Sequence, residues 1–341
     1  MLNYFSSGRF SMKKITLAIV LLTAACLVVF GAGQKDSSAQ KTVELKIAHV
    51  LPTNEPIHQV LVEMGKRIMD RSQGSIKVQV YPNSELGNNK DNLEQIRRGA
   101  NIIAIADPGY ISDYVPDYGV MNGPVLYRDY TGIAKLAAST WHQDMVKQSA
   151  EKGIKILAMD WYFGSRHVIS DKVIKNTDDM KGLKVRVPPN KVWIETIKAM
   201  GGSPTTLQWS EVYSGLSQGV VDAAEAPLST LYGSKLYEAK KKIALTGHFK
   251  AIVGLEMSQK LFESMTPEQQ KILTEEVAWG GKEATKRVAD SESEWRKKLE
   301  AEGVVFNDVD LDNFANACQV VYTQFPAWTP GLYERVKAEL K

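Results

Sequence analysis

The chain has 341 residues, of which 44% are hydrophobic and 24% are charged. This is ordinary globular composition, and the length is sufficient for two domains with sizeable cores. The formal net charge is +3, but Arg9, Lys13 and Lys14 supply that whole excess within the first 33 residues, which contain no acid. The rest of the chain is formally neutral and has no extended basic run to follow a phosphate backbone, so we expect no nucleic-acid partner.

The N-terminal 33 residues have the pattern of an export signal. Their three basic residues precede an uncharged apolar run at 15–30, which is too short for a comfortable membrane span and is typical of a signal peptide. We therefore expect a signal peptide at 1–33, a polar tether at 34–42 and an extracytoplasmic, periplasmic protein. The small residues at 31–33 suit ordinary signal peptidase, whereas Cys26 leaves a lipid anchor open.

The next hundred or so residues predict an α/β layer with a mostly parallel sheet. Alternating and buried apolar patterns predict strands at 43–50, 76–81 and 102–106, and helical periodicity predicts helices at 60–71 and 88–98. A loop with Pro52 and Pro56 precedes the first helix and holds His58. Ligands of such sheets bind beyond the carboxyl ends of the strands, which is where Asn89 and Asp107 fall.

The second part of the chain predicts another α/β layer and one long helix. We expect strands at 154–161, 168–170, 183–187 and 220–224, and helices at 131–153, 190–200, 210–218 and 267–302. The long helix begins with Thr266-Pro267-Glu268-Gln269, which offers an N-cap, a proline at the first helical position and a capping-box glutamine. Gly280-Gly281 in its middle is a candidate bend between domains.

Two arginines stand beside predicted strands, Arg166 and Arg186. The planar guanidinium fork can hold a carboxylate through two parallel, charge-assisted hydrogen bonds. The alternative for Arg186 is a surface ion pair with Asp178 or Asp179, and the alternative for Arg166 is a purely structural clamp. The spacing alone does not decide, for either arginine, between binding a ligand carboxylate and the structural alternative.

Several motifs in a fixed order resemble one family, the extracytoplasmic solute receptors of TRAP transporters of the DctP type. The order is RH, DDMKGLKVRVP, MGGSPTTL, an aromatic residue before SEVY, and QGVVDAAE-x-P, preceded by YPNSELGNNKDNLEQIRRG. The resemblance covers essentially all of the chain after the signal. It implies an α/β, two-domain periplasmic-binding-protein-like clamshell with hinge strands and one long helix spanning both domains. We expect domain I at 43–163 plus 252–285 and domain II at 164–251 plus 286–341.

The resemblance also implies a carboxylate site in the cleft between the domains. Arg186, in KVRVP, corresponds to the residue that pairs with the ligand carboxylate, Arg166 to a second arginine, and Trp209 to an aromatic that packs on the ligand. Polar ligand contacts are expected from Asn89, Asp107 and Asn190. His58 and Phe163 are further candidates for the cleft wall, while Trp161 and Trp193 are expected mainly in the core.

The function implied is binding of a small organic acid and its delivery to the small and large TRAP membrane subunits, without a catalytic step, cofactor or metal. Contact with the membrane is then expected only through the permease or a lipid anchor. A receptor that reports its ligand to a membrane kinase remains an alternative. A secreted hydrolase using Ser217 in the G-x-S-x-G at 215–219 is a weaker one, because a helical pattern precedes this serine where a nucleophile elbow needs a strand. Ala226, where relatives often carry Asn, and the bulky Trp209 favour a less polar ligand.

Overall fold

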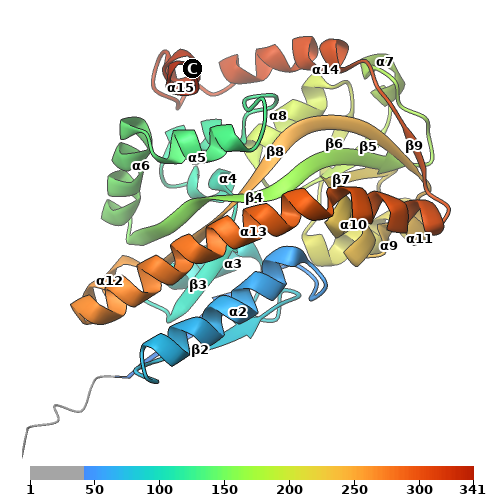
Figure 1. Cartoon of the computed structure of the whole chain (residues 1–341). Helices are drawn as coiled ribbons and strands as arrows, with labels where there is room; N and C mark the ends of the chain where they lie inside the picture. The colour runs from blue at the N-terminus through green and yellow to red at the C-terminus, as the bar shows by residue number, and fades with distance from the viewer. Residues whose placement is uncertain (1–41) are drawn as a thin grey trace, which may run out of the picture. The chain divides into compact units, whose positions relative to one another are not determined.

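Two long strands organise the part of the chain that this computed structural model describes, residues 42–341. They are β4 (Ile154–Ser170) and β8 (Lys242–Ser258), which contain 17 residues each and pair antiparallel. Both run from one α/β layer into the other and curve across the molecule in Figure 1. The predicted signal peptide and nearly all of the tether lie outside the described residues.

Each end of this strand pair carries its own group of shorter strands. The order in the sheet is β2-β1-β3-β8-β4-β7-β5-β6, and β9 pairs with β8. The other strands are β1 (Val43–Ala48), β2 (Ile76–Tyr81), β3 (Ile102–Ala106), β5 (Lys184–Val187), β6 (Ser203–Thr206), β7 (Ala223–Pro227) and β9 (Val305–Asn307). We call β2-β1-β3 the first half-sheet and β7-β5-β6 the second half-sheet. Pairing is parallel within each half and antiparallel at β3–β8, β8–β4 and β4–β7.

Helices fill the connections and cover the sheet (Figure 1). Before β4 they are α2 (Pro56–Arg71), α3 (Asn89–Arg97), α4 (Pro108–Ile111), η1 (Pro116–Asn122), α5 (Thr131–Ala137) and α6 (Thr140–Glu151). Between β4 and β8 they are α7 (Thr177–Met180), α8 (Lys191–Ala199), η2 (Trp209–Glu211), α9 (Val212–Ser217), α10 (Leu228–Gly233) and α11 (Leu236–Ala239). After β8 they are α12 (Gln259–Ser264), α13 (Pro267–Ala301), α14 (Leu311–Cys318), η3 (Gln319–Thr323) and α15 (Leu332–Glu339).

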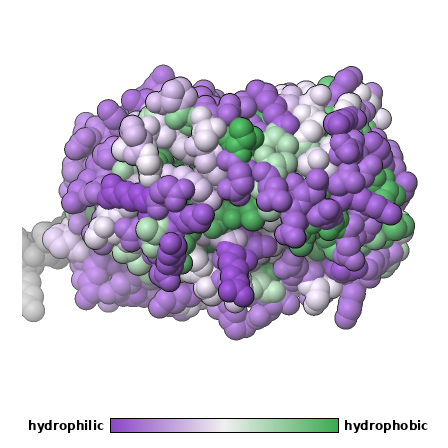
Figure 2. All heavy atoms as spheres, turned by 90° about the horizontal axis from the view of Figure 1, so that it is seen from above, coloured by the Kyte–Doolittle hydropathy of each residue, from purple (hydrophilic) through white to green (hydrophobic). Residues whose placement is uncertain are grey.

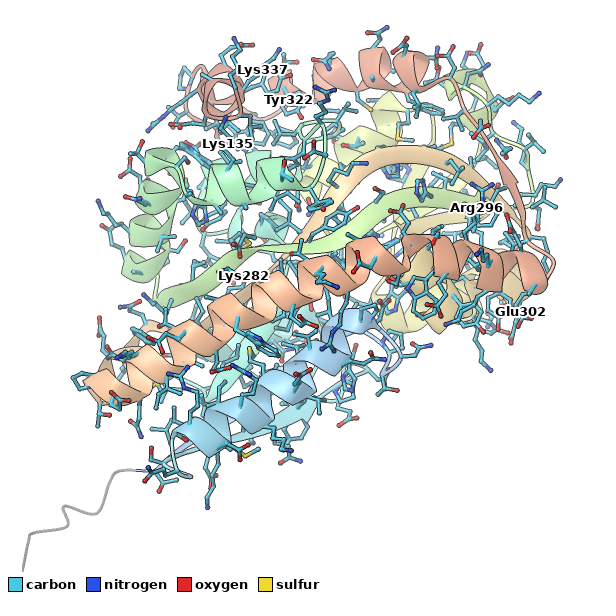
Figure 3. All side chains as sticks on the ribbon, in the orientation of Figure 1. Lys135, Lys282, Arg296, Glu302, Tyr322 and Lys337 are labelled. Atoms are coloured by element: carbon cyan, nitrogen blue, oxygen red, sulfur yellow. The ribbon has the colours of Figure 1, made fainter. Side chains whose placement is uncertain are left out.

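The predicted long helix is present as α13, which contains 35 residues and is therefore about 50 Å long. Its start has the expected capping box, in which the Thr266 side chain accepts a hydrogen bond from the Gln269 backbone N–H and the Gln269 side chain accepts one from the Thr266 N–H. Lys282, Arg296 and Glu302 lie on its exposed side or at its end (Figure 3). The apolar side packs along β4 and α2, so the helix ties both half-sheets together.

Gly280 and Gly281 have a packing role in this helix. Both lie against the fully buried indole of Trp161, and a Cβ added at either position would come within 2.8 Å of that ring. The glycines therefore make room for a tryptophan on β4, and α13 continues through them without interruption. Their role as a bend between domains stays a prediction.

The sequence predictions for β1, β2, β3, α3, β5 and α8 hold within a few residues, whereas other elements differ from the predictions in their bounds or continuity. The predicted strands at 154–161 and 168–170 are one strand, β4, because β-bulges allow it to continue past Gly164. The predicted helix at 131–153 is two helices, separated where Ser139 caps α6. α2 begins at Pro56, so His58 lies in a helix and not in a loop. β7 begins at Ala223, three residues later than expected, and β8 was not predicted.

The hydrophobic core is divided in a way that fits two domains. One large buried cluster belongs to the first half-sheet and its helices, and three smaller clusters belong to the second. The exact domain bounds stay a proposal, with one revision for the last helix. Leu332 and Val336 of α15 pack in the large cluster, so residues 332–339 associate with domain I and not, as expected, with domain II.

The described surface is largely hydrophilic on the face shown in Figure 2, where apolar residues occur in small separate groups. Exposed Leu311 and Val320 lie on α14 and η3. Within residues 42–341, no helix is both long enough and apolar enough to cross a membrane.

The contact between α13 and Trp161 gives a prediction that opposes helix propensity. In an ordinary exposed helix, Gly→Ala stabilises by about 1 kcal/mol. Because the added methyl group would enter the Trp161 ring, we expect Gly280→Ala to lower the free energy of unfolding by about 1–3 kcal/mol, as overpacked cores do. Urea unfolding measures this. In a Trp161→Phe background, which opens space, the same substitution should cost less, and a stabilising Gly280→Ala in the wild-type background would contradict the packing role.

Candidate ligand-binding cavity

A cavity lies where the two half-sheets face each other. Its volume is about 70 Å³, and residues from both half-sheets line it. The first half-sheet and its loops contribute Leu51, Asn89, Ile105 and Asp107, among others. The second half-sheet and its connections contribute Arg186, Pro188, Trp193, Gln208, Trp209 and Thr230. β4 and β8 supply the floor through Phe163, Arg166, Ala251, Ile252 and Val253.

Arg186 is buried in this cavity, and no carboxylate of residues 42–341 is bonded to it. It is 3% exposed, and its Nε and Nη2 donate to the backbone oxygen of Leu207 at 3.0 and 2.8 Å. Burial lowers the pKa of its guanidinium to about 10, and the negative charge of Glu225 offsets part of that shift. Asp178 pairs with Lys181 and Asp179 caps α7, so the surface ion-pair alternative is wrong. Arg186 is thus a buried cation that lines the cavity and makes no hydrogen bond to a carboxylate within residues 42–341.

Arg166 carries a compensated charge. On β4, its Nε donates to Glu225 Oε2, and its Nη2 donates to Glu225 Oε1 at 2.9 Å and to the Glu225 backbone oxygen at 2.7 Å. Arg166 holds the pKa of Glu225 at about 2 although burial would raise it, and His248 Nε2 lies 3.6 Å from the same carboxylate. This geometry is that of the structural clamp, while Arg166 still lines the cavity wall.

Aromatic rings support both arginines. The indole of Trp209 lies 5.1 Å from the Arg186 guanidinium carbon, and the indole of Trp193 lies 4.4 Å from that of Arg166. Trp209 is also fixed by a 3.2 Å hydrogen bond from its Nε1 to Ser234 Oγ. Cation–π contacts hold the flexible arginine side chains in place. Trp209 and Phe163 line the cavity as predicted, and so does Trp193, whereas Trp161 lies in the core beneath α13.

Asp107 and Asn190 join the two sides of the cavity. Asp107 Oδ1 accepts hydrogen bonds from the backbone of Gly109 at 2.9 Å, from Asn122 Nδ2 and from Asn190 Nδ2 at 2.8 Å. Burial nevertheless raises its pKa to about 6. The Asn190 side-chain oxygen caps α8 through Val192 N and Trp193 N, so its polar atoms are occupied and it does not line the cavity. Asn190 therefore acts as a bridge to Asp107, in place of the direct ligand contact that was expected.

Of the remaining residues singled out in the sequence, Asn89 lines the cavity, whereas His58 and Ala226 do not. Asn89 is the first residue of α3. The buried Oδ1 of Asn89 makes no hydrogen bond of normal geometry within the described chain. The Asn89 side chain is nevertheless close enough to the Tyr110 hydroxyl to act against the rise in the pKa of Tyr110 that burial causes. His58 does not line the cavity: its Nδ1 lies 3.0 Å from His49 Nε2, and His49 Nδ1 accepts from the backbone of Leu51. Ala226 is buried in the core beside β4 and is not part of the wall.

Sequence reasoning missed several wall residues, chiefly Tyr110, Gln208 and Thr230. Two members of the wall besides Asn89 have a buried polar atom without a hydrogen bond within residues 42–341: Nε1 of Trp193 and Oγ1 of Thr230. Buried polar groups in native proteins are nearly always satisfied by protein, water or ligand. No local motif marks these residues, because helix packing and the meeting of distant segments bring them to the wall.

The alternative chemistries find no matching geometry in the described residues. Ser217 is the exposed last residue of α9, and a turn and β7 follow it, so the strand that must precede a nucleophile elbow is absent at this serine. Within residues 42–341 there is no cluster of three His, Cys, Asp or Glu side chains arranged to hold a metal ion.

Comparison with known proteins gives a consistent result. The family "Bacterial extracellular solute-binding protein, family 7", or DctP, matches residues 47–327. A relative from Vibrio cholerae, the sialic acid-binding periplasmic protein SiaP, is 28% identical over 92% of this chain and 95% of its own length. TRAP periplasmic solute-binding proteins from Fusobacterium nucleatum, with bound sn-glycerol-3-phosphate, and Ochrobacterium anthropi, with bound L-fuconate, are 35% and 36% identical. Their TM-scores are 0.86 and 0.85, and the matches cover 88% of this chain and 97% and 100% of theirs.

Two further structures indicate which conformation is present. A TRAP solute-binding protein from Escherichia fergusonii in an apo open form is 32% identical and gives a TM-score of 0.77. A Polaromonas protein bound to D-erythronate is only 27% identical but gives 0.81. This structure is thus more similar to the ligand-bound form of a more distant relative than to an open form of a nearer one, in agreement with the Asp107–Asn190 bridge. With the fold, the cavity and the match over residues 47–327, the chain belongs to family 7 of the bacterial extracellular solute-binding proteins, the DctP family of TRAP solute receptors.

Proposed function

We propose that this chain is the periplasmic receptor of a TRAP transporter and that Arg186 binds the carboxylate of its small organic acid ligand. One observation carries the proposal: a guanidinium that is buried in the cavity and has no carboxylate bonded to it in the described part of the chain. A buried charge without a partner is costly, and an anionic ligand removes that cost. The proteins with bound L-fuconate and D-erythronate, both carboxylates, support this ligand class.

Arg166 and Arg186 have different parts in this proposal. Glu225 neutralises Arg166, so this residue shapes the wall and adds a hydrogen-bond donor but little net charge. Arg186 supplies the positive charge, and Trp209 holds its guanidinium and offers a face for the ligand. Phe163, Asn89 and Asp107 complete the contacts on the remaining sides of the cavity.

Closure of the cleft follows from the position of these groups on both half-sheets. A ligand held by Arg186 that also reaches Asn89 and Asp107 makes its full set of contacts only when the two sides are together, and so it shifts the population to the closed form. The closed form then delivers the acid to the small and large membrane subunits. Export through the predicted signal at 1–33 places the receptor outside the cytoplasm, and Cys26 would anchor it if lipidated.

The role of Arg186 is tested by calorimetric titration. A melting-shift screen of organic acids, including L-fuconate, D-erythronate and sn-glycerol-3-phosphate, first identifies a binder. We expect Arg186→Ala to abolish its binding and Arg186→Lys to weaken it strongly, because a single ammonium group cannot replace the fork. Arg296→Ala, which removes an exposed arginine of α13, is the control and should bind normally. Unchanged affinity in Arg186→Ala would refute the anchor.

The two arginines should also differ in their effect on stability without ligand. Arg166→Met leaves the fully buried Glu225 without its partner and should cost about 3–5 kcal/mol. Arg186→Met should change the free energy of unfolding by less than about 1 kcal/mol, because the loss of the hydrogen bonds to Leu207 and of the contact with Trp209 is offset by removal of an unpaired buried cation. Urea unfolding of the ligand-free proteins compares them. Equal losses would show that Arg186 is also a structural residue.

Closure itself is visible in solution. Small-angle scattering of the wild-type protein should show a smaller radius of gyration when the binder identified in the screen is added, since the ligand stabilises the closed form. Arg186→Ala at the same ligand concentration serves as the control and should keep the radius of the ligand-free protein. A radius that is the same with and without ligand in the wild type would contradict the clamshell mechanism.

A further inference from the structure

Glu55 is a further buried carboxyl group, and it lies close to Thr230 of the cavity wall. This residue is the N-cap of α2, it is 1% exposed, and neither of its carboxyl oxygens makes a hydrogen bond of normal geometry within residues 42–341. It also has no ion-pair partner in this part of the chain, since the nearby Arg166 is bonded to Glu225. A buried carboxyl without a firm partner is unusual, because simple packing would be served better by an apolar side chain.

The groups nearest to Glu55 come from the opposite side of the cleft. The hydroxyls of Ser229 and Thr230 on α10 lie close enough to lower the pKa of Glu55, and so does the charge of Arg166, but burial outweighs them and raises it to about 7. The loop before α2 also contacts α10 at Gly233, where an added Cβ would lie 2.5 Å from the Asn54 side-chain oxygen. Glu55 and Thr230 thus meet because the two half-sheets are together.

Thr230 connects this carboxyl to the ligand space. It is 2% exposed, it lines the cavity, and its Oγ1 makes no hydrogen bond of normal geometry within the described chain. A threonine hydroxyl has one hydrogen to donate and two lone pairs that accept. When the hydrogen is directed to Glu55, the lone pairs are left for a donor in the cavity. The cavity therefore has a hydrogen-bond acceptor at Thr230 in addition to the cation at Arg186.

We propose that Thr230, positioned by Glu55, accepts a hydrogen bond from a hydroxyl group of the ligand, so that the receptor selects hydroxylated carboxylates over unsubstituted ones. This inference rests on the proposed function, because it assumes that Arg186 holds the carboxylate. The unpartnered Oδ1 of Asn89 provides a second acceptor for a hydroxyl group. A site with buried hydrogen-bonding groups discriminates strongly against a ligand that leaves them unpaired.

The preference also couples to closure. Since Glu55 precedes α2 and Thr230 belongs to α10, the oriented hydroxyl exists only in the closed form. A hydroxylated acid gains this contact on closure, whereas an alkyl acid buries the same polar atoms without a partner. Specificity is then exerted at the closing step, after the carboxylate has reached Arg186.

Matched acids of equal chain length test the subsite by calorimetry. The probes are L-fuconate against hexanoate and D-erythronate against butyrate. We expect the wild-type protein to bind at least one hydroxylated acid more tightly than its unsubstituted partner. Thr230→Val should weaken binding of that hydroxylated acid about tenfold or more, the loss of one buried hydrogen bond, and leave the unsubstituted acid unchanged. Thr230→Ser should retain the preference. Thr196→Val is the matched control, because Thr196 is a fully buried threonine outside the cavity wall.

Variants of Glu55 separate positioning from simple packing. Glu55→Leu should reduce the ratio of the two affinities, and Glu55→Gln, which keeps an acceptor for the Thr230 hydroxyl, should restore it. A ratio that is the same in wild type, Thr230→Val and Thr230→Ala would overturn the subsite, as would a wild-type preference for the unsubstituted acids. A wild-type protein that binds none of the four carboxylates would contradict the proposed carboxylate function instead.

Discussion

The properties of the cavity depend on a difference between two buried arginines, Arg166 and Arg186: one is paired with a carboxylate of the described chain and the other is not. Both lie among aromatic rings in the same cavity wall, but only Arg166 has a carboxylate, Glu225, within the described protein. If both were neutralised, the site would attract no anion. If neither were, two unpaired cations would share one poorly solvated space and the empty protein would be strongly destabilised. Pairing one and leaving the other makes Arg186 the guanidinium of the wall that has no bonded carboxylate within residues 42–341, and the carboxylate of a ligand can take that place.

Holding that arrangement together requires a scaffold that can open without losing its shape. β4 and β8 are shared by both half-sheets, and α13 packs along both, so three elements cross from one side to the other. The large core cluster of the first side and the smaller clusters of the second remain intact if these elements flex. Some of the contacts directly between the two sides are polar and local, such as Asp107–Asn190 and Lys191–Asp113. Such contacts are formed and lost at a lower cost than an apolar core, which suits repeated opening.

Sequence patterns predict the parts of this fold whose signals are local. The segment Thr266-Pro267-Glu268-Gln269 predicts the start of α13, and the alternation of apolar and polar residues predicts β1 and β2. Both signals are local, because capping and amphipathicity depend on residues a few positions apart. β8 was missed, and β4 was divided in two, because strands shared between domains are buried by both and bend at bulges, which weakens the alternation. Among the site residues, Arg186 and Trp209 are recognisable by their motifs. The partner of Arg166 and the position of Thr230 are not, since Glu225 is 59 residues from Arg166 in the chain and the contact exists only in three dimensions.

The structure also changes the argument about ligand polarity. In the sequence, Ala226 in place of a polar residue and the large Trp209 favour a less polar ligand. Ala226, however, lies in the core, so its identity does not describe the ligand surface. What does describe that surface is the set of buried atoms on Asn89, Trp193 and Thr230 that make no hydrogen bond of normal geometry within residues 42–341, and these atoms favour a polar ligand. The aromatic rings of Trp209 and Trp193 then serve to exclude water around Arg186 and Arg166. Because the local dielectric constant is low without water, each hydrogen bond that a hydroxylated acid makes in the closed cavity is strengthened.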